Sequence, residues 1–157
     1  MNWESFGLIE GIISSLGVVL SLVYLATQIR AQNRESRISS IHDINESFRN
    51  AISSFQDPVL ADLFARAKDD FDSLSETERL QFISMMQGVL RVWEDAFHQH
   101  KEKRLPEHIW KAMVIQFSGY LSLTGVQKVW ALRKKAYSKD FRLFVDSTKA
   151  LEYKSSL

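Results

Sequence analysis

The hydrophobic positions divide this chain into two parts with different patterns. From Gly11 to Ile29 the sequence reads GIISSLGVVLSLVYLATQI, 19 residues without a charged side chain, close to the ~20 that a bilayer-spanning helix requires. Apolar residues occur there on every side of a helix rather than along one stripe. We therefore predict a transmembrane anchor with a juxtamembrane basic turn over residues 1–37, followed by a helical domain over residues 38–157.

Two other interpretations of the apolar run are considered. A secretory signal peptide requires a basic start and a small-residue cleavage site, whereas the first 29 residues contain no Lys or Arg and carry Glu4 and Glu10 before the run. A buried core helix is the alternative that stays open. Against it stand the all-round apolar pattern and the aromatic residues Trp3 and Tyr24 near the two ends, as at membrane interfaces.

Charge predicts the orientation of the span. Arg30, Arg34 and Arg37 follow it directly, while the N-terminal flank is acidic. The positive-inside rule therefore places the N-terminus outside and the C-terminal domain in the cytoplasm. Because the three arginines share one helical face, we expect them to contact anionic lipid headgroups; the alternative is that they act only as stop-transfer charges.

Small residues within the run indicate self-association. Gly7 and Gly11 form a GxxxG pair, and Ser14 and Ser21 continue along nearly the same face, which allows two helices to approach closely in lipid. We take these four residues as the oligomerisation face and expect a homo-oligomer, although such residues are also common in membrane helices. Glu10 is a candidate functional acid, with the alternative that it simply reaches the outer interface.

Past the span, apolar residues recur every three or four positions, as expected for one buried helical stripe. No Pro or Gly occurs between Gly17 and Asp57, so one long helix is predicted from the bilayer into the domain. Asp57-Pro58 is expected to end it and to cap the next helix. The stripe consists of Ile38, Ile41, Ile44, Phe48, Ile52 and Phe55.

The remaining sequence repeats this helical pattern. Ser75 and Glu78 form a capping box ahead of a near-heptad stripe. Leu105-Pro106 is expected to end that helix, and Thr124-Gly125 is expected to end the next one. A period of two, as in strands, is absent. We predict an all-α fold with a bundle of five or six helices after the anchor. The near-heptad stripe consists of Ile83, Met86, Leu90, Trp93 and Phe97.

The best candidate for chemistry lies within this helix. Asp95 and His98 are three residues apart, and Glu94 and His98 are four apart, so either pair could share a helix face and hold a metal ion. Di-metal helical bundles, however, use a Glu-x-x-His pair from each of two helices, and a second acid–His pair at that spacing is missing from the sequence. Phosphate-binding glycine loops and nucleophile elbows are also missing. We predict no cofactor and no catalytic residue.

Charge and composition narrow the function further. The chain has 20 basic and 19 acidic residues, without the basic excess typical of nucleic-acid binders, so no nucleic-acid partner is expected. It contains no cysteine, which excludes disulfides and thiolate metal sites. The expected partners are the lipid bilayer, further copies of the chain and an unidentified protein.

The segments from Gly7 to Ile13 and from Ser21 to Asn33 resemble an uncharacterised family of small bacterial membrane-anchored proteins. Those proteins have a similar apolar start ending in a Tyr-Leu-Ala-x-Gln-Ile-Arg-like stretch, here Tyr24 to Arg30. A helical domain rich in Trp and Phe follows in them. The resemblance implies a bacterial source and supports the anchor; it implies no activity.

Together these observations predict a non-enzymatic protein of the bacterial inner membrane, single-pass, that self-associates through its anchor and presents the helical domain as a scaffold or docking surface. The first alternative is a small homo-oligomeric channel or pore lined by Ser14, Ser21 and Glu10. The second is a membrane-tethered metalloenzyme that uses Asp95 and His98.

Overall fold

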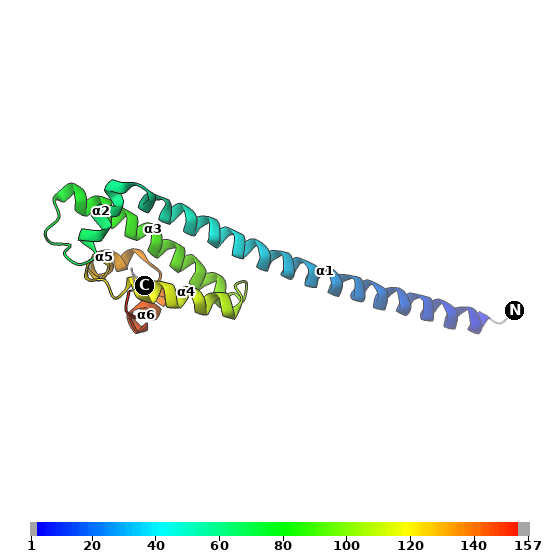
Figure 1. Cartoon of the computed structure of the whole chain (residues 1–157). Coiled ribbons are helices and arrows are strands. Elements are labelled where there is room, and N and C mark those ends of the chain that lie inside the picture. Colours follow the sequence, from blue (N-terminus) through cyan, green and yellow to red (C-terminus); the bar gives the residue numbers. More distant parts are fainter. Residues whose placement is uncertain (1–2, 154–157) are drawn as a thin grey trace. The chain divides into compact units, whose positions relative to one another are not determined.

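The computed structural model describes the backbone of residues 3–153 and the side chains of residues 16–153. Within this range the regular elements are six α-helices and two short 3-10 helices, without a strand (Figure 1). The predicted all-α class is therefore confirmed. The elements are α1 (Trp3–Ser53), η1 (Ser54–Gln56), α2 (Pro58–Ala67), α3 (Glu76–Lys101), α4 (Glu107–Tyr120), α5 (Thr124–Arg133), η2 (Lys134–Ala136) and α6 (Lys139–Ser147).

The chain divides into two compact units, the first ending at Ser39 and the second beginning at Ser40. The first unit is the N-terminal part of a single helix, α1. Among the described residues, the structure contains no helical stretch long and apolar enough for a membrane crossing. The predicted span starts at Gly11, and residues 11–15 lie outside the residues whose side chains are described.

The start of α2 follows from local chemistry, as the sequence predicts. Pro58 occupies the first helical position, where its missing N–H costs nothing. The Asp57 carboxylate oxygen Oδ1 accepts hydrogen bonds from the backbone N–H groups of Val59 at 2.8 Å and Leu60 at 3.2 Å. These bonds satisfy two of the N–H groups that have no partner inside the helix.

A capping box starts α3. The Ser75 hydroxyl oxygen accepts from the backbone N–H of Glu78 at 3.3 Å, and the Glu78 carboxylate accepts from the backbone N–H of Ser75 at 2.9 Å. Hydrogen bonds from the Ser75 amide, Arg66 and the Ser75 hydroxyl lower the pKa of Glu78 to about 2. The predicted capping box is thus confirmed.

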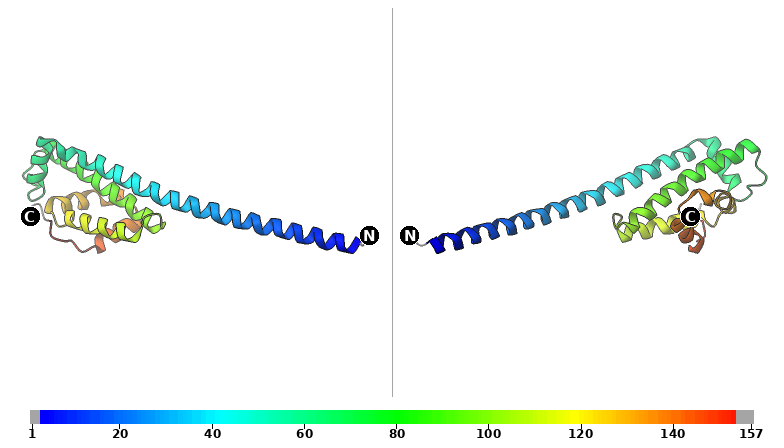
Figure 2. Two further views of the ribbon diagram at one scale, coloured as in Figure 1. Left: turned by 45° about the vertical axis from the view of Figure 1, so that its right-hand side comes forward. Right: turned by 180° about the vertical axis from the view of Figure 1, so that it is seen from behind.

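Helix α3 is the centre of the second unit. It contacts α2, α4 and α5, and in the views of Figures 1 and 2 it runs alongside the C-terminal part of α1 with α4 next to it. All five residues of the predicted near-heptad stripe are buried. Phe82, Val89 and Ala96, which lie outside the stripe, are almost completely buried too. Several helices cover α3, whereas the stripe alone predicts one covered face.

Aromatic rings fill the space beside α3. Trp93 is 1% exposed and stacks on Phe117 of α4 with ring centroids 5.1 Å apart. Phe141 and Phe144 of α6 meet the same indole edge-on at 5.7 and 5.8 Å. Such ring pairs contribute roughly 0.5–1.5 kcal/mol each beyond the area they bury, so Trp93 links three helices of the core.

Gly125 is required because its backbone lies close to the backbone at the end of α2. The backbone N–H of Gly125, in α5, donates to the Lys68 carbonyl oxygen at 3.0 Å. A Cβ atom at this position would overlap the carbonyl oxygen of Ala67 and lie 3.2 Å from the Phe82 ring. Both the Ala67 carbonyl and Phe82 belong to the packed interior, so neither can move cheaply.

Ile38 departs from the predicted stripe. The spacing places it with the buried residues of the long helix, but it is 48% exposed, whereas Ile44 is 2% exposed. The core of the second unit begins at Ser40, so Ile38 lies before the residues that this core covers. The inclusion of Ile38 in the buried stripe was wrong.

The glycine contact yields a stability prediction. We expect Gly125→Ala to destabilise the full-length protein by about 3 kcal/mol, because the added methyl group cannot be accommodated without a backbone shift. Thermal unfolding in detergent, followed by tryptophan fluorescence, measures the loss. Gly88→Ala is the matched control: its Cβ would lie 3.9 Å from the Ala51 side chain, an ordinary contact, and alanine favours the helix. Equal stability of the two variants would contradict the prediction.

Candidate functional site

A segment of α1 exposes large apolar side chains on every side. Between Leu16 and Ile29, which we call the apolar segment, their exposed fractions range from 51% to 63%. Among its described residues, the first unit consists of one helix, without a second element against which they could pack. Contiguous exposed apolar surface of this kind marks a site of interaction with membrane or protein. The residues are Leu16, Val18, Val19, Leu20, Leu22, Val23, Tyr24, Leu25 and Ile29.

The polar groups of the apolar segment bond to their own helix. The Ser21 hydroxyl donates to the Gly17 carbonyl oxygen at 2.8 Å, and the Thr27 hydroxyl donates to the Tyr24 carbonyl oxygen at 2.7 Å. The Gln28 amide donates to the Tyr24 hydroxyl oxygen at 2.9 Å. These bonds lower the cost of placing such side chains where water is absent.

Basic side chains follow the apolar segment directly. Arg30, Arg34 and Arg37 are exposed, and in the described part of the chain their guanidinium groups form no ion pair. Spacings of four and three place them along one side of the helix. An anionic surface is therefore free to contact all three.

The structure describes the side chains of only some of the other residues predicted for the anchor. Ser21 lies within the apolar segment as expected. Gly7, Gly11 and Ser14, the rest of the predicted oligomerisation face, and the candidate acid Glu10 lie outside the residues whose side chains the structure describes.

The candidate metal ligands have other partners. The Asp95 carboxylate accepts from the Gln99 side-chain amide at 2.9 Å. His98 uses Nε2 to contact the Ser138 hydroxyl at 3.0 Å. Among the described side chains, no group of three or more His, Cys, Asp or Glu residues is placed to hold a metal ion.

His98 instead belongs to a polar cluster that joins α3 to the start of α6. Glu94 is 9% exposed; its Oε1 accepts from the Ser138 backbone N–H and its Oε2 from the Arg91 guanidinium, each at 2.7 Å. Arg91 also donates to the Ala136 carbonyl oxygen at 3.0 Å and lies 4.4 Å from the centroid of the Tyr137 ring. One face of α3 thus holds residues 136–138.

The electrostatics of Glu94 support its role in this cluster. Burial raises the pKa of Glu94, but hydrogen bonds from the Ser138 amide, the Ser138 hydroxyl and Arg91 outweigh it, so the pKa lies below its ordinary value. The carboxylate stays ionised and accepts both Ser138 groups. Glu94 binds the Ser138 backbone N–H, so the Ser138–His98 contact lies where α3 meets the start of α6.

Sequence reasoning missed this cluster. The Arg91–Glu94 pair is a readable (i, i+3) ion pair, but its contacts with residues 136–138 join positions more than 40 residues apart. Ser138 is the N-cap residue of α6 by backbone conformation, although its side chain makes no capping bond. Its hydroxyl is used by the polar cluster.

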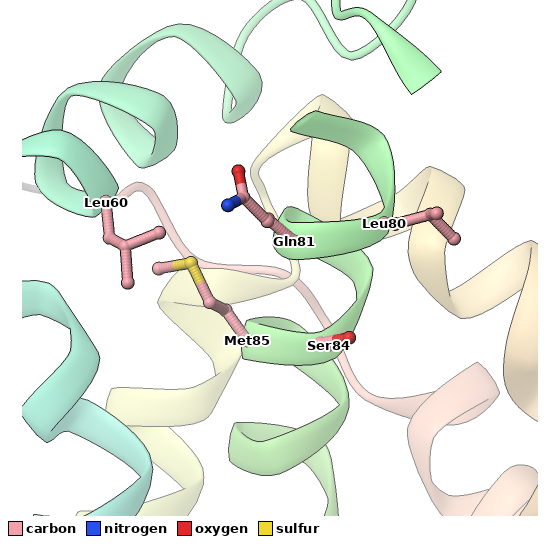
Figure 3. A pocket seen from close by; sticks show the side chains of 5 residues that line it. All are labelled: Leu60, Leu80, Gln81, Ser84 and Met85. Carbon is pink, nitrogen blue, oxygen red and sulfur yellow. The ribbon is translucent and has the colours of Figure 1, made fainter. Parts of the chain in front are cut away.

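A shallow hollow of about 370 Å³ lies on the second unit. Figure 3 shows Leu60 of α2 and Met85 of α3 pointing toward one another across it, while Leu80 points away. Gln81 and Ser84 complete its lining. None of these side chains titrates near neutral pH, so the hollow offers no acid–base group.

Comparison with known proteins leaves the family open. Neither models of protein families, nor curated sequences, nor solved structures give a match to this chain. The resemblance noted around Tyr24 to Asn33 therefore stays a prediction, and function has to be argued from the chain's own surfaces.

The polar cluster generates a pH-dependent prediction. Because the folded protein lowers the pKa of Glu94, its stabilising contribution is complete above the ordinary carboxyl pKa and is lost as the pH falls through the folded value. We expect Glu94→Gln to destabilise the fold by about 2 kcal/mol at pH ~7, and by progressively less as the pH falls through the lowered pKa of Glu94, where the wild-type carboxyl becomes protonated too.

Thermal unfolding of the full chain across this pH range measures the effect. Asp95→Asn is the matched control, since this neighbouring carboxylate is exposed and bonds only locally to Gln99. A Glu94→Gln penalty that is independent of pH would refute the role assigned to the charged carboxylate.

Proposed function

We propose that this protein is a membrane-anchored docking protein of the bacterial inner membrane. In this proposal residues 11–29 cross the bilayer once, and the helical domain lies on the cytoplasmic side as a non-enzymatic scaffold. The anchor also brings copies of the chain together. One observation carries the proposal: the apolar segment exposes large apolar side chains all around α1, and the described part of its own unit has no second element to bury them.

Solvation favours a lipid environment for this segment. In water each exposed Leu, Val or Ile side chain would forgo roughly 1.5–3 kcal/mol of burial. A helix that is apolar on all sides finds burial either inside a large core or in hydrocarbon. The first unit has no core, because it consists of one helix. Hydrocarbon is therefore the environment that matches the apolar side chains on this helix.

Length defines which residues the span needs. At a rise of about 1.5 Å per residue, the described residues 16–29 extend over about 21 Å, which is short of the ~30 Å hydrocarbon core. Addition of residues 11–15 brings the uncharged stretch to about 28 Å. The proposal therefore requires these five residues as the outer end of the span.

Charge supports the proposed orientation. The guanidinium groups of Arg30, Arg34 and Arg37, which form no ion pair with any described residue, begin directly after the apolar segment, where the negative surface of a cytoplasmic leaflet would attract them. Translocating these charges is unfavourable. The second unit follows them in sequence and would accordingly stay in the cytoplasm.

A docking role suits the second unit. It has its own aromatic core around Trp93, and its polar cluster has the features of a structural joint. The alternatives have less support: the hydroxyl groups of Ser21 and Thr27 bond to their own helix rather than remaining free to line a pore, and Asp95 and His98 have other hydrogen-bond partners.

Membrane insertion is tested by charge placed in the apolar segment. We expect wild-type protein, expressed in bacteria, to stay in the membrane pellet after alkaline carbonate washing. The double variant Leu20→Arg/Val23→Arg should be released, since each arginine near the centre of a span costs roughly 2.5–3.5 kcal/mol on insertion.

Ile115→Arg is the control. Ile115 is 63% exposed on α4 of the second unit, so this variant should stay in the pellet. Release of the wild-type protein by carbonate would refute the anchor.

Orientation is tested by labelling. The chain has no cysteine, so Ser5→Cys and Lys135→Cys each introduce one thiol. In intact spheroplasts a membrane-impermeant maleimide should label the first and not the second. Replacement of Arg30, Arg34 and Arg37 by Glu should produce a fraction of molecules with the reverse pattern. Labelling of Lys135→Cys from outside in the otherwise unchanged protein would contradict a cytoplasmic domain.

A further inference from the structure

The polar positions of the apolar segment follow one line along α1. Five residues between positions 16 and 29 are not aliphatic, and four of them are spaced by four, three and four residues. This is the spacing of the contact positions in a left-handed helix pair. Thr27 lies off the line, and its hydroxyl is satisfied by its own backbone. We call the four residues the polar seam: Gly17, Ser21, Tyr24 and Gln28.

The same line reverses its polarity beyond the apolar segment. Residues 30–39 read RAQNRESRIS, and their two apolar side chains, Ala31 and Ile38, follow Tyr24 at intervals of seven. Ile38 is 48% exposed among polar neighbours. The line is thus the least apolar side of the helix within the apolar segment, and beyond that segment it holds both apolar side chains of residues 30–39, together with Glu35, which follows Gln28 by seven residues. A surface that faces another helix throughout has this property, because it faces neither lipid nor water.

Gly17 provides a separate indication of a close partner. A Cβ atom at Gly17 would meet nothing within 4 Å, so the chain's own fold does not require a glycine there. Glycine also weakens a helix relative to alanine. Its small size is useful only if another backbone approaches this point, as small residues allow in membrane helix pairs.

Gln28 and Tyr24 supply groups that match a second copy of themselves. The Gln28 amide uses one N–H to donate to the Tyr24 hydroxyl oxygen, which leaves its second N–H, its carbonyl oxygen and the phenol O–H for a partner. A primary amide both donates and accepts, so two such amides can pair across a two-fold axis. Another copy of this chain would carry the same amide and phenol groups at the same depth in the bilayer.

We infer that a second copy docks in parallel along the polar seam, with each seam residue next to the same residue of its partner. This inference rests on the proposed function, because insertion in one orientation is what makes the copies parallel. It also revises the predicted oligomerisation face. Ser14 precedes Ser21 by seven residues and stays in step with the seam, whereas Gly11 precedes Val18 by seven and falls among lipid-facing positions.

Single-cysteine crosslinking tests the seam, since the chain has no cysteine of its own. Full-length variants Gly17→Cys, Ser21→Cys and Tyr24→Cys are oxidised with copper phenanthroline in native membranes. We expect disulfide-linked dimers at these positions. Val19→Cys, Leu22→Cys and Ala26→Cys, on the opposite side of the helix, are the matched controls and should crosslink several times less.

The Gln28 contact is tested in the Ser21→Cys background. Gln28→Leu should lower the dimer fraction, with an association about threefold weaker, as for the loss of an average interhelical hydrogen bond. Gln28→Asn, which keeps the amide, should retain more dimer. Equal dimer fractions in both variants would overturn the assigned amide contact.

Carbonate washing of the same membranes distinguishes a failure of the seam from a failure of the membrane anchor. Protein that stays in the pellet but crosslinks best at Gly11→Cys and Val18→Cys would overturn the seam and leave the anchor in place. Protein that stays in the pellet but crosslinks without helical periodicity would also overturn the seam and leave the anchor in place. Protein released from the pellet would overturn the proposed function, and the seam would fall with it.

Discussion

The need to remove apolar surface from water determines how the second unit is built. Helix α3 buries residues around most of its circumference, and Trp93 contacts rings from α4 and α6 at centroid distances between 5.1 and 5.8 Å. The other elements follow from this demand: α5 approaches closely enough that only glycine fits at Gly125, and Glu94 holds the backbone that leads into α6. A polar group is tolerated beside this core because its hydrogen bonds offset its desolvation.

The first unit faces the same demand, and its described residues form one helix. Between Leu16 and Ile29 its helix is apolar around the circumference except along the polar seam and at Thr27. A soluble helix shows one apolar stripe on a polar surface; here one narrow polar line crosses an apolar surface. Lipid around the helix and a second helix along the seam would satisfy both surfaces together, which is why the anchor and the self-association are treated as parts of one proposal.

How much was predictable from sequence depends on the range of the interactions. The Asp57 cap, the Ser75–Glu78 capping box and the buried stripe of α3 are determined within a few residues, and the spacing alone predicts them. The polar cluster is not local: Glu94 acquires its function only when Ser138 reaches it. Ile38 shows the converse, since its spacing fits the stripe but no core is present at its position. The environment of Glu94 and that of Ile38 both depend on tertiary packing and not on the residues next to them in sequence.

The contrast between the two units bears on what a docking protein requires. A domain that presents a surface must keep its own shape, and the Trp93 rings and the Glu94–Ser138 bond fix the second unit from within. An anchor that pairs with a copy of itself instead needs a surface that stays unsatisfied until the partner arrives, which describes Gly17 and the free half of the Gln28 amide. Pairing would place two domains at one point of the membrane, so that a partner with two matching surfaces would bind both domains with an avidity that neither provides alone.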